Sequence, residues 1–273
     1  MSHITKYGPF EKQYMNHRGM LLTGDELHGF DTLFKVGHND SVGTSFVCIS
    51  PGGLCRLPKP SDATTLRVKA GGNVADTADG AGARSVLLQG IDETGAAIEV
   101  VLALAGVLAS ASTSQLFMRL NRVIVIETGV YPTAFNVDGA VADIVIENTA
   151  GTEDWVTVSV NGHADCQSQM AFYSVPAGHR AYLSSLNMFV DTNKSVDLLL
   201  VVRQNFMDET AGYTPVRVGA TIAGVEGHVN IPFTEPPRFA EFTDIAMLAR
   251  VSTGTAAVSV QITFLLNTNA PAS

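Results

Sequence analysis

A glycine-rich stretch, residues 70–84, holds the most chemically suggestive side chains of the sequence. It reads AGGNVADTADGAGAR and offers the carboxylates of Asp76 and Asp79 together with backbone N–H groups that glycines leave accessible. Calcium and phosphate are the ligands that such a loop could hold. The spacing, however, is not that of an EF-hand and lacks its bidentate glutamate, and a strand rather than the helix of a phosphate-binding loop is expected from Arg84. We therefore expect a flexible loop between strands, and no metal or other cofactor.

Histidines that could act as bases or metal ligands are scattered along the chain. His163, His179 and His228 are separated by loops, so they form none of the close pairs that chelate a metal. His179 lies in a turn that enters a strand, and the sequence suggests no carboxylate partner for it. The HExxH, GxSxG, Walker A and GxGxxG motifs are all missing. No catalytic residue emerges, and we expect that the protein is not an enzyme.

The three cysteines, Cys48, Cys55 and Cys166, fit no CxxC or zinc-site spacing. We expect reduced thiols made in a reducing cytosol. A Cys48–Cys55 bridge that closes a loop is the alternative.

The charge balance argues against two classes of partner. Seventeen Lys and Arg against 26 Asp and Glu give a formal net charge of −9, which repels nucleic acids and anionic membranes. The most apolar stretch, residues 96–111, is shorter than the roughly 20 residues that span a bilayer, and the N-terminus lacks the apolar core of a signal peptide. Only 16% of residues are charged, so Thr, Ser, Asn and Gly must cover much of the surface.

Short β-branched and apolar runs separated by turn residues dominate from about Asp40 onward, which predicts an all-β fold. Residues 155–160 alternate large apolar with small positions, as an antiparallel strand with one buried face does, and Trp155 is expected in the core. The turn Asp92–Gly95 predicts that the runs on either side of it pair. The expected strands are Leu66–Lys69, Arg84–Ile91, Ala97–Leu104, Phe117–Ile126, Ile144–Glu147, Trp155–Val160, Met170–Val175, Arg180–Val190, Val196–Arg203, Val216–Thr221, Ile245–Val251 and Val258–Leu266.

Strand runs of this number and spacing predict two successive antiparallel β-sandwich domains of a jelly-roll-like kind, preceded by an extended N-terminal arm. A weak internal repeat, GARSVL at residues 82–87 against GHRAYL at residues 178–183, agrees with two related halves. The expected boundaries are residues 1–40 for the arm, 41–163 for the first domain and 164–273 for the second.

The arm contains no alanine, and its aromatic residues follow no period, so it cannot build a core of its own. We expect it to become ordered against another chain. Its candidate interface residues are Tyr7, Phe10, Tyr14, Phe30 and Phe34.

Leu265 is a further interface candidate. It lies between Phe264 and Leu266 at the end of an alternating strand, so it must face the side opposite to its two neighbours. An isolated sandwich would leave Leu265 in water, whereas a second subunit would cover it. Cover from the chain's own arm is the alternative.

Two groups of motifs resemble virion proteins of tailed bacteriophages, especially marine and environmental ones. FYSVPAGHRAYL at residues 172–183 is similar to a recurring Tyr-x-Ile/Val-Pro-Ala-Gly-Lys-x-Ala-Tyr-Leu pattern, with His179 in place of the lysine. DTADGAGAR at residues 76–84, followed by VLLQGID and FMRLNR at residues 86–92 and 117–122, resembles a second run of the same group. The resemblance covers roughly residues 40–266 and transfers no catalytic residue.

The resemblance implies a non-enzymatic virion structural protein, most closely a capsid decoration or cement protein that stabilises the head lattice. Its implied partners are copies of itself, with a trimer favoured, and the phage major capsid protein or other virion proteins. Its implied location is the virion, after assembly in the host cytoplasm. The alternative is a tail, neck or appendage component that binds a receptor or carbohydrate.

Overall fold

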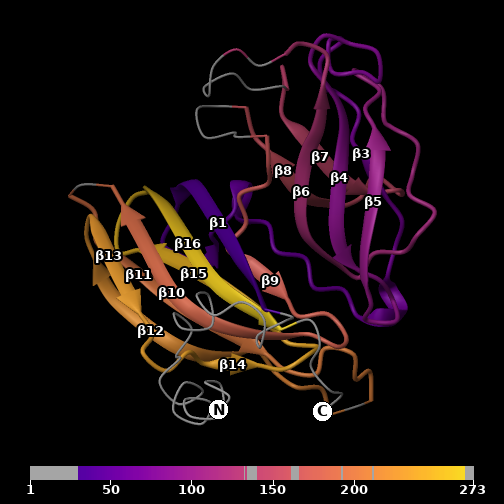
Figure 1. Cartoon of the computed structure of the whole chain (residues 1–273). Helices are drawn as coiled ribbons and strands as arrows, with labels where there is room; N and C mark the ends of the chain where they lie inside the picture. The colour runs from indigo at the N-terminus through magenta and orange to yellow at the C-terminus, as the bar shows by residue number, and fades with distance from the viewer. Residues whose placement is uncertain are drawn as a thin grey trace, which may run out of the picture.

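The computed structural model describes residues 30–131, 133, 140–160, 166–191, 193–210 and 212–267. These residues form strands, turns and two short 3-10 segments, Pro51–Gly53 and Pro60–Asp62. The chain is therefore all-β, as its sequence predicts. Within the described ranges, no helix is long and apolar enough to cross a membrane. Figure 1 shows the strands gathered into two lobes.

One lobe contains mostly C-terminal strands, arranged in two antiparallel sheets (Figure 1). The first, called the β10 sheet, runs in the order β1 (Phe30–Val42), β16 (Ala256–Asn267), β10 (Arg180–Val190) and β13 (His228–Pro232), with β14 (Arg238–Phe239) also paired to β10. The second, called the β15 sheet, runs in the order β12 (Arg217–Val225), β11 (Val196–Arg203), β15 (Asp244–Val251) and β2 (Val47–Cys48), with β9 (Phe172–Ser174) also paired to β15.

The other lobe contains two three-stranded antiparallel sheets. The β7 sheet has the order β3 (Leu66–Val68), β7 (Ile144–Asn148) and β8 (Asp154–Val158). The β4 sheet has the order β5 (Ala97–Ala103), β4 (Ala83–Ile91) and β6 (Arg119–Thr128). The predicted hairpin between β4 and β5 is confirmed, since Ile91 pairs with Ala97 and Gly95 takes a φ of 87° in the turn.

Each lobe buries a cluster of apolar side chains supplied by both of its sheets. In β16, alternate residues from Val258 to Phe264 are fully buried and join the first cluster, because a strand directs every second side chain to the same face. Trp155 is buried in the second cluster, as predicted. Phe172, Val201 and Ala246 of the C-terminal lobe also belong to the second cluster, so the two lobes share a continuous apolar contact.

The predicted arm needs a correction at its C-terminal end. Residues 30–42 form strand β1, which pairs with β16 from Phe30↔Asn267 to Val42↔Ala256, so the first described strand lies beside the last (Figure 1). The sequence concealed this strand because Lys35 and Gly37 occupy inward positions that usually hold apolar residues. The boundary expected at residue 41 also did not anticipate that β1 and β2 join sheets of the C-terminal half.

Leu265 is buried within the chain itself, so the expectation that a second subunit is needed to cover it is wrong. Leu265 lies between Thr32 of β1 and Tyr182 of β10 in the sheet, and only 3% of it is exposed. A side chain already buried in its own chain has almost no apolar surface left for a second subunit. Leu265 is therefore removed from the interface candidates.

Candidate functional site

The outer face of the β10 sheet is the candidate site. It is the side turned away from the buried cluster, and strand register places its residues in three rows across four strands. The rows are Phe34, Thr263, Ser185 and Pro232; Val36, Gln261, Asn187 and Asn230; and His38, Ser259, Phe189 and His228.

Strand alternation produces this face directly. β16 sends Val260 and Ile262 into the core and presents Ser259, Gln261 and Thr263 on the other side. The middle of the face consequently consists of hydroxyl and amide groups without a formal charge. In a chain with a net charge of −9, such a neutral area is a surface on which a second negatively charged molecule meets little repulsion.

Apolar side chains stand at two places on the outer face. Phe34 and Phe189 are 54% and 50% exposed, and Val36 is also exposed. The Phe189 ring stacks on His228 with centroids 4.5 Å apart and an interplanar angle of 15°. Exposed aromatic rings beside neutral hydrogen-bonding groups are the composition that protein interfaces favour.

Some side chains of the outer face form hydrogen bonds with each other, whereas others can bond to a partner molecule. His38 Nδ1 lies 2.7 Å from Ser259 Oγ, and the Asn230 amide donates to Asn187 Oδ1. Among the described residues, the Gln261 side chain makes no hydrogen bond to a protein group. Its amide can therefore donate to and accept from a partner.

The structure places some of the predicted interface residues and does not describe others. Phe34 lies on the outer face, although it belongs to a paired strand instead of an arm. Phe30 begins β1, and its side chain is not described. Tyr7, Phe10 and Tyr14 lie outside the described residues. Sequence reasoning missed Phe189. The run Met188-Phe189-Val190 carried the signal, because its middle residue must face away from two buried neighbours.

Asp76 has a role that differs from both ligand hypotheses for the glycine-rich loop. Its buried carboxylate accepts hydrogen bonds from the backbone N–H groups of Ala83, Val141 and Ala142 at 2.9 to 3.0 Å. It thereby fastens the loop to the start of β4 and to residues 141–142. Among the residues that the structure describes, no group of three or more His, Cys, Asp and Glu could hold a metal ion.

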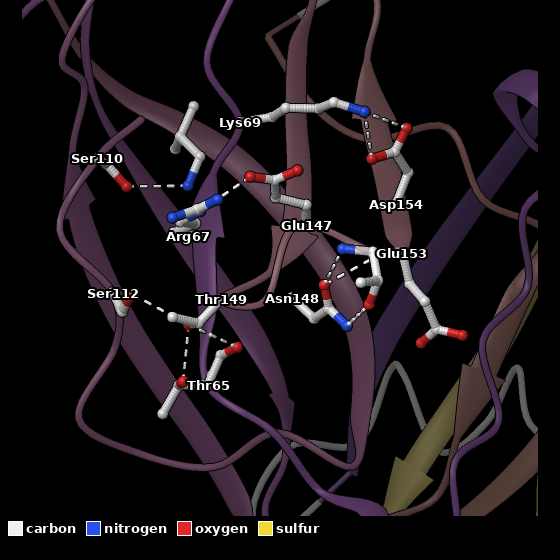
Figure 2. A network of polar contacts seen from close by, with 12 residues as sticks. Thr65, Arg67, Lys69, Ser110, Ser112, Glu147, Asn148, Thr149, Glu153 and Asp154 are labelled. Carbon is white, nitrogen blue, oxygen red and sulfur yellow. Dashed lines mark hydrogen bonds and ion pairs between the residues drawn. The ribbon is translucent and has the colours of Figure 1, made fainter. Parts of the chain in front are cut away.

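A second polar group, on the β7 sheet, is occupied with internal contacts (Figure 2). Arg67 Nε donates to Glu147 Oε1 at 2.8 Å, and Lys69 Nζ contacts both carboxylate oxygens of Asp154 at 2.8 and 2.9 Å. Figure 2 shows the two pairs close together: Arg67 of β3 reaches the adjacent β7, whereas Lys69, directly after β3, reaches across to Asp154 of β8. Because each charge in these two pairs faces an opposite charge, this surface offers less to a ligand than the outer face does.

Comparisons with known proteins do not place the chain in a family. No protein-family model matches it, and no curated protein matches it. Among solved structures, an Arthrobacter globiformis T6 isomalto-dextranase complexed with panose is 12% identical, with a TM-score of 0.22. The likeness covers 86% of this chain and 34% of the dextranase, so the chain spans about a third of that protein.

Two structures of infectious bursal disease virus are also weakly similar. A chain of the Gt strain is 9% identical with a TM-score of 0.20, over 88% of this chain and 75% of the viral chain. A chain of the T13 particle is 9% identical with a TM-score of 0.20, over 90% of this chain and 76% of the viral chain.

Proposed function

We propose that the chain is a non-enzymatic structural protein of a bacteriophage virion, most closely a capsid decoration or cement protein. The observation that carries the proposal is the outer face, where Phe34, Val36 and Phe189 are exposed beside neutral amide and hydroxyl groups. The motifs at residues 76–92, 117–122 and 172–183 support a virion setting. A protein that packs against a lattice has its exposed apolar groups covered after assembly.

The proposed architecture is a pair of β-sandwiches of a jelly-roll-like kind. Its support is that each lobe buries one apolar cluster supplied by two antiparallel sheets. The proposed contact between copies of this chain is the outer face, because its three rows carry no lysine, arginine or carboxylate. The nearby Asp40 carboxylate lies 2.5 Å from Nε2 of His38, at the edge of the third row. Placing that face at the contact keeps the charges of two negative subunits apart.

Sedimentation equilibrium tests the proposed self-association. The variant Phe34→Asp with Phe189→Asp introduces charge at two exposed positions of the outer face. The matched control is Val101→Asp, because Val101 of β5 is 55% exposed on the other lobe. We expect an oligomer for the wild type and the control, and a lower mass for the double variant. A wild-type monomer, or equal masses for all three proteins, would contradict the outer face as the contact.

Electron microscopy of intact virions labelled with antibody fragments against this chain tests the location. Label spread over the head supports decoration. Label confined to the tail, neck or appendages favours the alternative, a receptor- or carbohydrate-binding component. The absence of label from every part of the particle would overturn the virion proposal.

A further inference from the structure

A cavity of about 190 Å³ lies where β1 and β9 of one lobe meet the β4 sheet of the other. Its apolar walls include Leu33, Ile98, Pro176 and Leu266. Lys35, Glu99, Arg122 and His179 are also in the lining. The cavity therefore combines apolar walls with several charged or titratable side chains, as small-molecule sites do.

Lys35 is the most unusual of these residues. It points to the inner side of β1, opposite Ile262 in the register, and only 3% of it is exposed. Its ammonium donates to the backbone carbonyl of Asn121. A lysine ammonium has three donors, and within the described part of the chain Lys35 forms no ion pair. Its charge is thus buried beside the cavity without a carboxylate partner.

The other charged groups around the cavity leave it positive. Arg122 donates to the side-chain oxygen of Gln167, which is uncharged. Among the described residues of the lining, Glu99 is the one carboxylate, and it accepts a hydrogen bond from Gln89 at 2.7 Å. Burial raises the pKa of Tyr173, so this phenol in the lining stays neutral. Lys35 and Arg122 consequently favour an anion here, although the chain as a whole is negative.

The volume limits the size of the ligand. A cavity of about 150 Å³ in another protein holds benzene, so this one has room for roughly six to eight non-hydrogen atoms. We propose that the cavity binds a small organic carboxylate with a short apolar body, the carboxylate directed to Lys35 and Arg122 and the body against Leu33, Ile98 and Leu266. This proposal does not depend on the proposed virion function.

Binding of the carboxylate should depend on pH, and the titration of Lys35 determines the direction. Burial, and then the neighbouring charge of Arg122, lowers the pKa of Lys35 from 10.5 to about 7. The ammonium is present below that pKa and lost above it, so binding should be tighter at about pH 6 than at about pH 8, by roughly tenfold if Lys35 alone causes the change. In the part of the chain that the structure describes, Glu99, Arg122, His179 and Tyr173 are the other titratable groups that line the cavity.

Isothermal titration with hexanoate tests the proposal, with hexan-1-ol as the uncharged probe of similar size. We expect hexanoate to bind the wild type at about pH 6 and hexan-1-ol to bind at least tenfold more weakly. Lys35→Met should weaken hexanoate binding and remove its pH dependence. Arg122→Gln should weaken binding and move the pH dependence to higher pH, because the Arg122 charge no longer lowers the pKa of Lys35. Lys59→Met is the matched control, because Lys59 is exposed on the surface beside Asp62. His179→Gln should leave the pH dependence unchanged.

Each other result counts against the proposal. If hexanoate does not bind, or hexan-1-ol binds equally well, the cavity is not a carboxylate site. If hexanoate binds Lys35→Met and Arg122→Gln as tightly as the wild type, the carboxylate contacts other residues. If His179→Gln removes the pH dependence, the histidine and not Lys35 recognises the anion. The two cation variants are independent, so failure of one to fold leaves the other as a test.

Discussion

Arg119 and Asp244 form a bidentate ion pair although they lie 125 positions apart in the sequence. Nε and Nη2 of the arginine lie 2.9 and 3.0 Å from the two carboxylate oxygens, and both side chains are buried. The guanidinium also donates to the Met118 carbonyl and lies 4.7 Å above the centroid of the Phe206 ring. The pair therefore links β6 of one lobe to β15 of the other.

Removing one member of this pair should destabilise the protein strongly. We expect Arg119→Met to lower the free energy of unfolding by about 3–5 kcal/mol, because it leaves the Asp244 carboxylate buried without a cation. The matched control is Arg250→Met. Arg250 also pairs with an aspartate, Asp197, and lies over a phenylalanine ring, but this pair is partly exposed, so the expected loss is at most about 1 kcal/mol. Urea unfolding of the two variants and the wild type measures both losses of unfolding free energy. Equal losses would mean that burial does not make the Arg119–Asp244 pair more important than the exposed one.

The buried ammonium of Lys35 should make stability depend on pH. The pKa of Lys35 is about 7 in the folded protein and 10.5 without burial, so the unfolded chain holds this proton to higher pH. The contribution of Lys35 to the unfolding free energy should therefore rise from about pH 7 to about pH 10, by at most about 5 kcal/mol. Below about pH 7 both states are protonated, and the penalty for the buried charge is constant.

Comparing Lys35→Met with the wild type isolates this effect. Met keeps the length of the side chain and removes the charge, so the variant should be more stable at and below neutral pH, with an advantage that shrinks as the pH rises. Urea midpoints of both proteins at several pH values measure it, and Lys59→Met should follow the wild type. An advantage that does not change with pH would mean that the ammonium is not desolvated.

The stability that the loop at residues 70–84 gives the protein should depend on the Asp76 carboxylate and not on bound calcium. Asp76→Ala leaves the backbone N–H groups of Ala83, Val141 and Ala142 without their acceptor, so we expect a loss of about 1–3 kcal/mol. Asp79→Ala is the control, because Asp79 is exposed in the same loop. Thermal unfolding of the wild type should be unchanged by calcium or a chelator. A rise in the melting temperature with calcium would restore the cation hypothesis.

The sequence predicts individual strands and turns, but it does not predict which distant segments contact each other. Each strand expected from residues 66–266 corresponds to an observed one, because turn residues and alternation act over a few positions. Strand β1 was missed because its partner, β16, lies more than 200 residues away and its inward Lys35 breaks the apolar pattern. Alternation correctly placed Leu265 opposite Phe264 but could not reveal that neighbouring parts of the chain cover it. The same alternation, applied to Met188-Phe189-Val190, would have indicated the outer face.

The last prediction concerns Gly37, where β1 passes close to the rest of the lobe. A Cβ atom at Gly37 would lie 2.4 Å from both the Ala171 nitrogen and the Ile49 oxygen, which are backbone atoms that cannot rotate away. Gly37→Ala should therefore force β1 outward and lower the free energy of unfolding by about 1–3 kcal/mol or more. Gly43→Ala is the control, because a Cβ there meets nothing within 4 Å.

Hydrogen exchange separates this local effect from general unfolding. In Gly37→Ala, amides of β1 should exchange faster than in the wild type, while those of β4 and β6 in the other lobe keep their protection. Because β1 also carries Phe34 and Val36 of the outer face, the variant should sediment at a lower mass if that face joins subunits. Unchanged stability and exchange in Gly37→Ala would mean that β1 does not pack as closely against Ala171 and Ile49 as the structure places it.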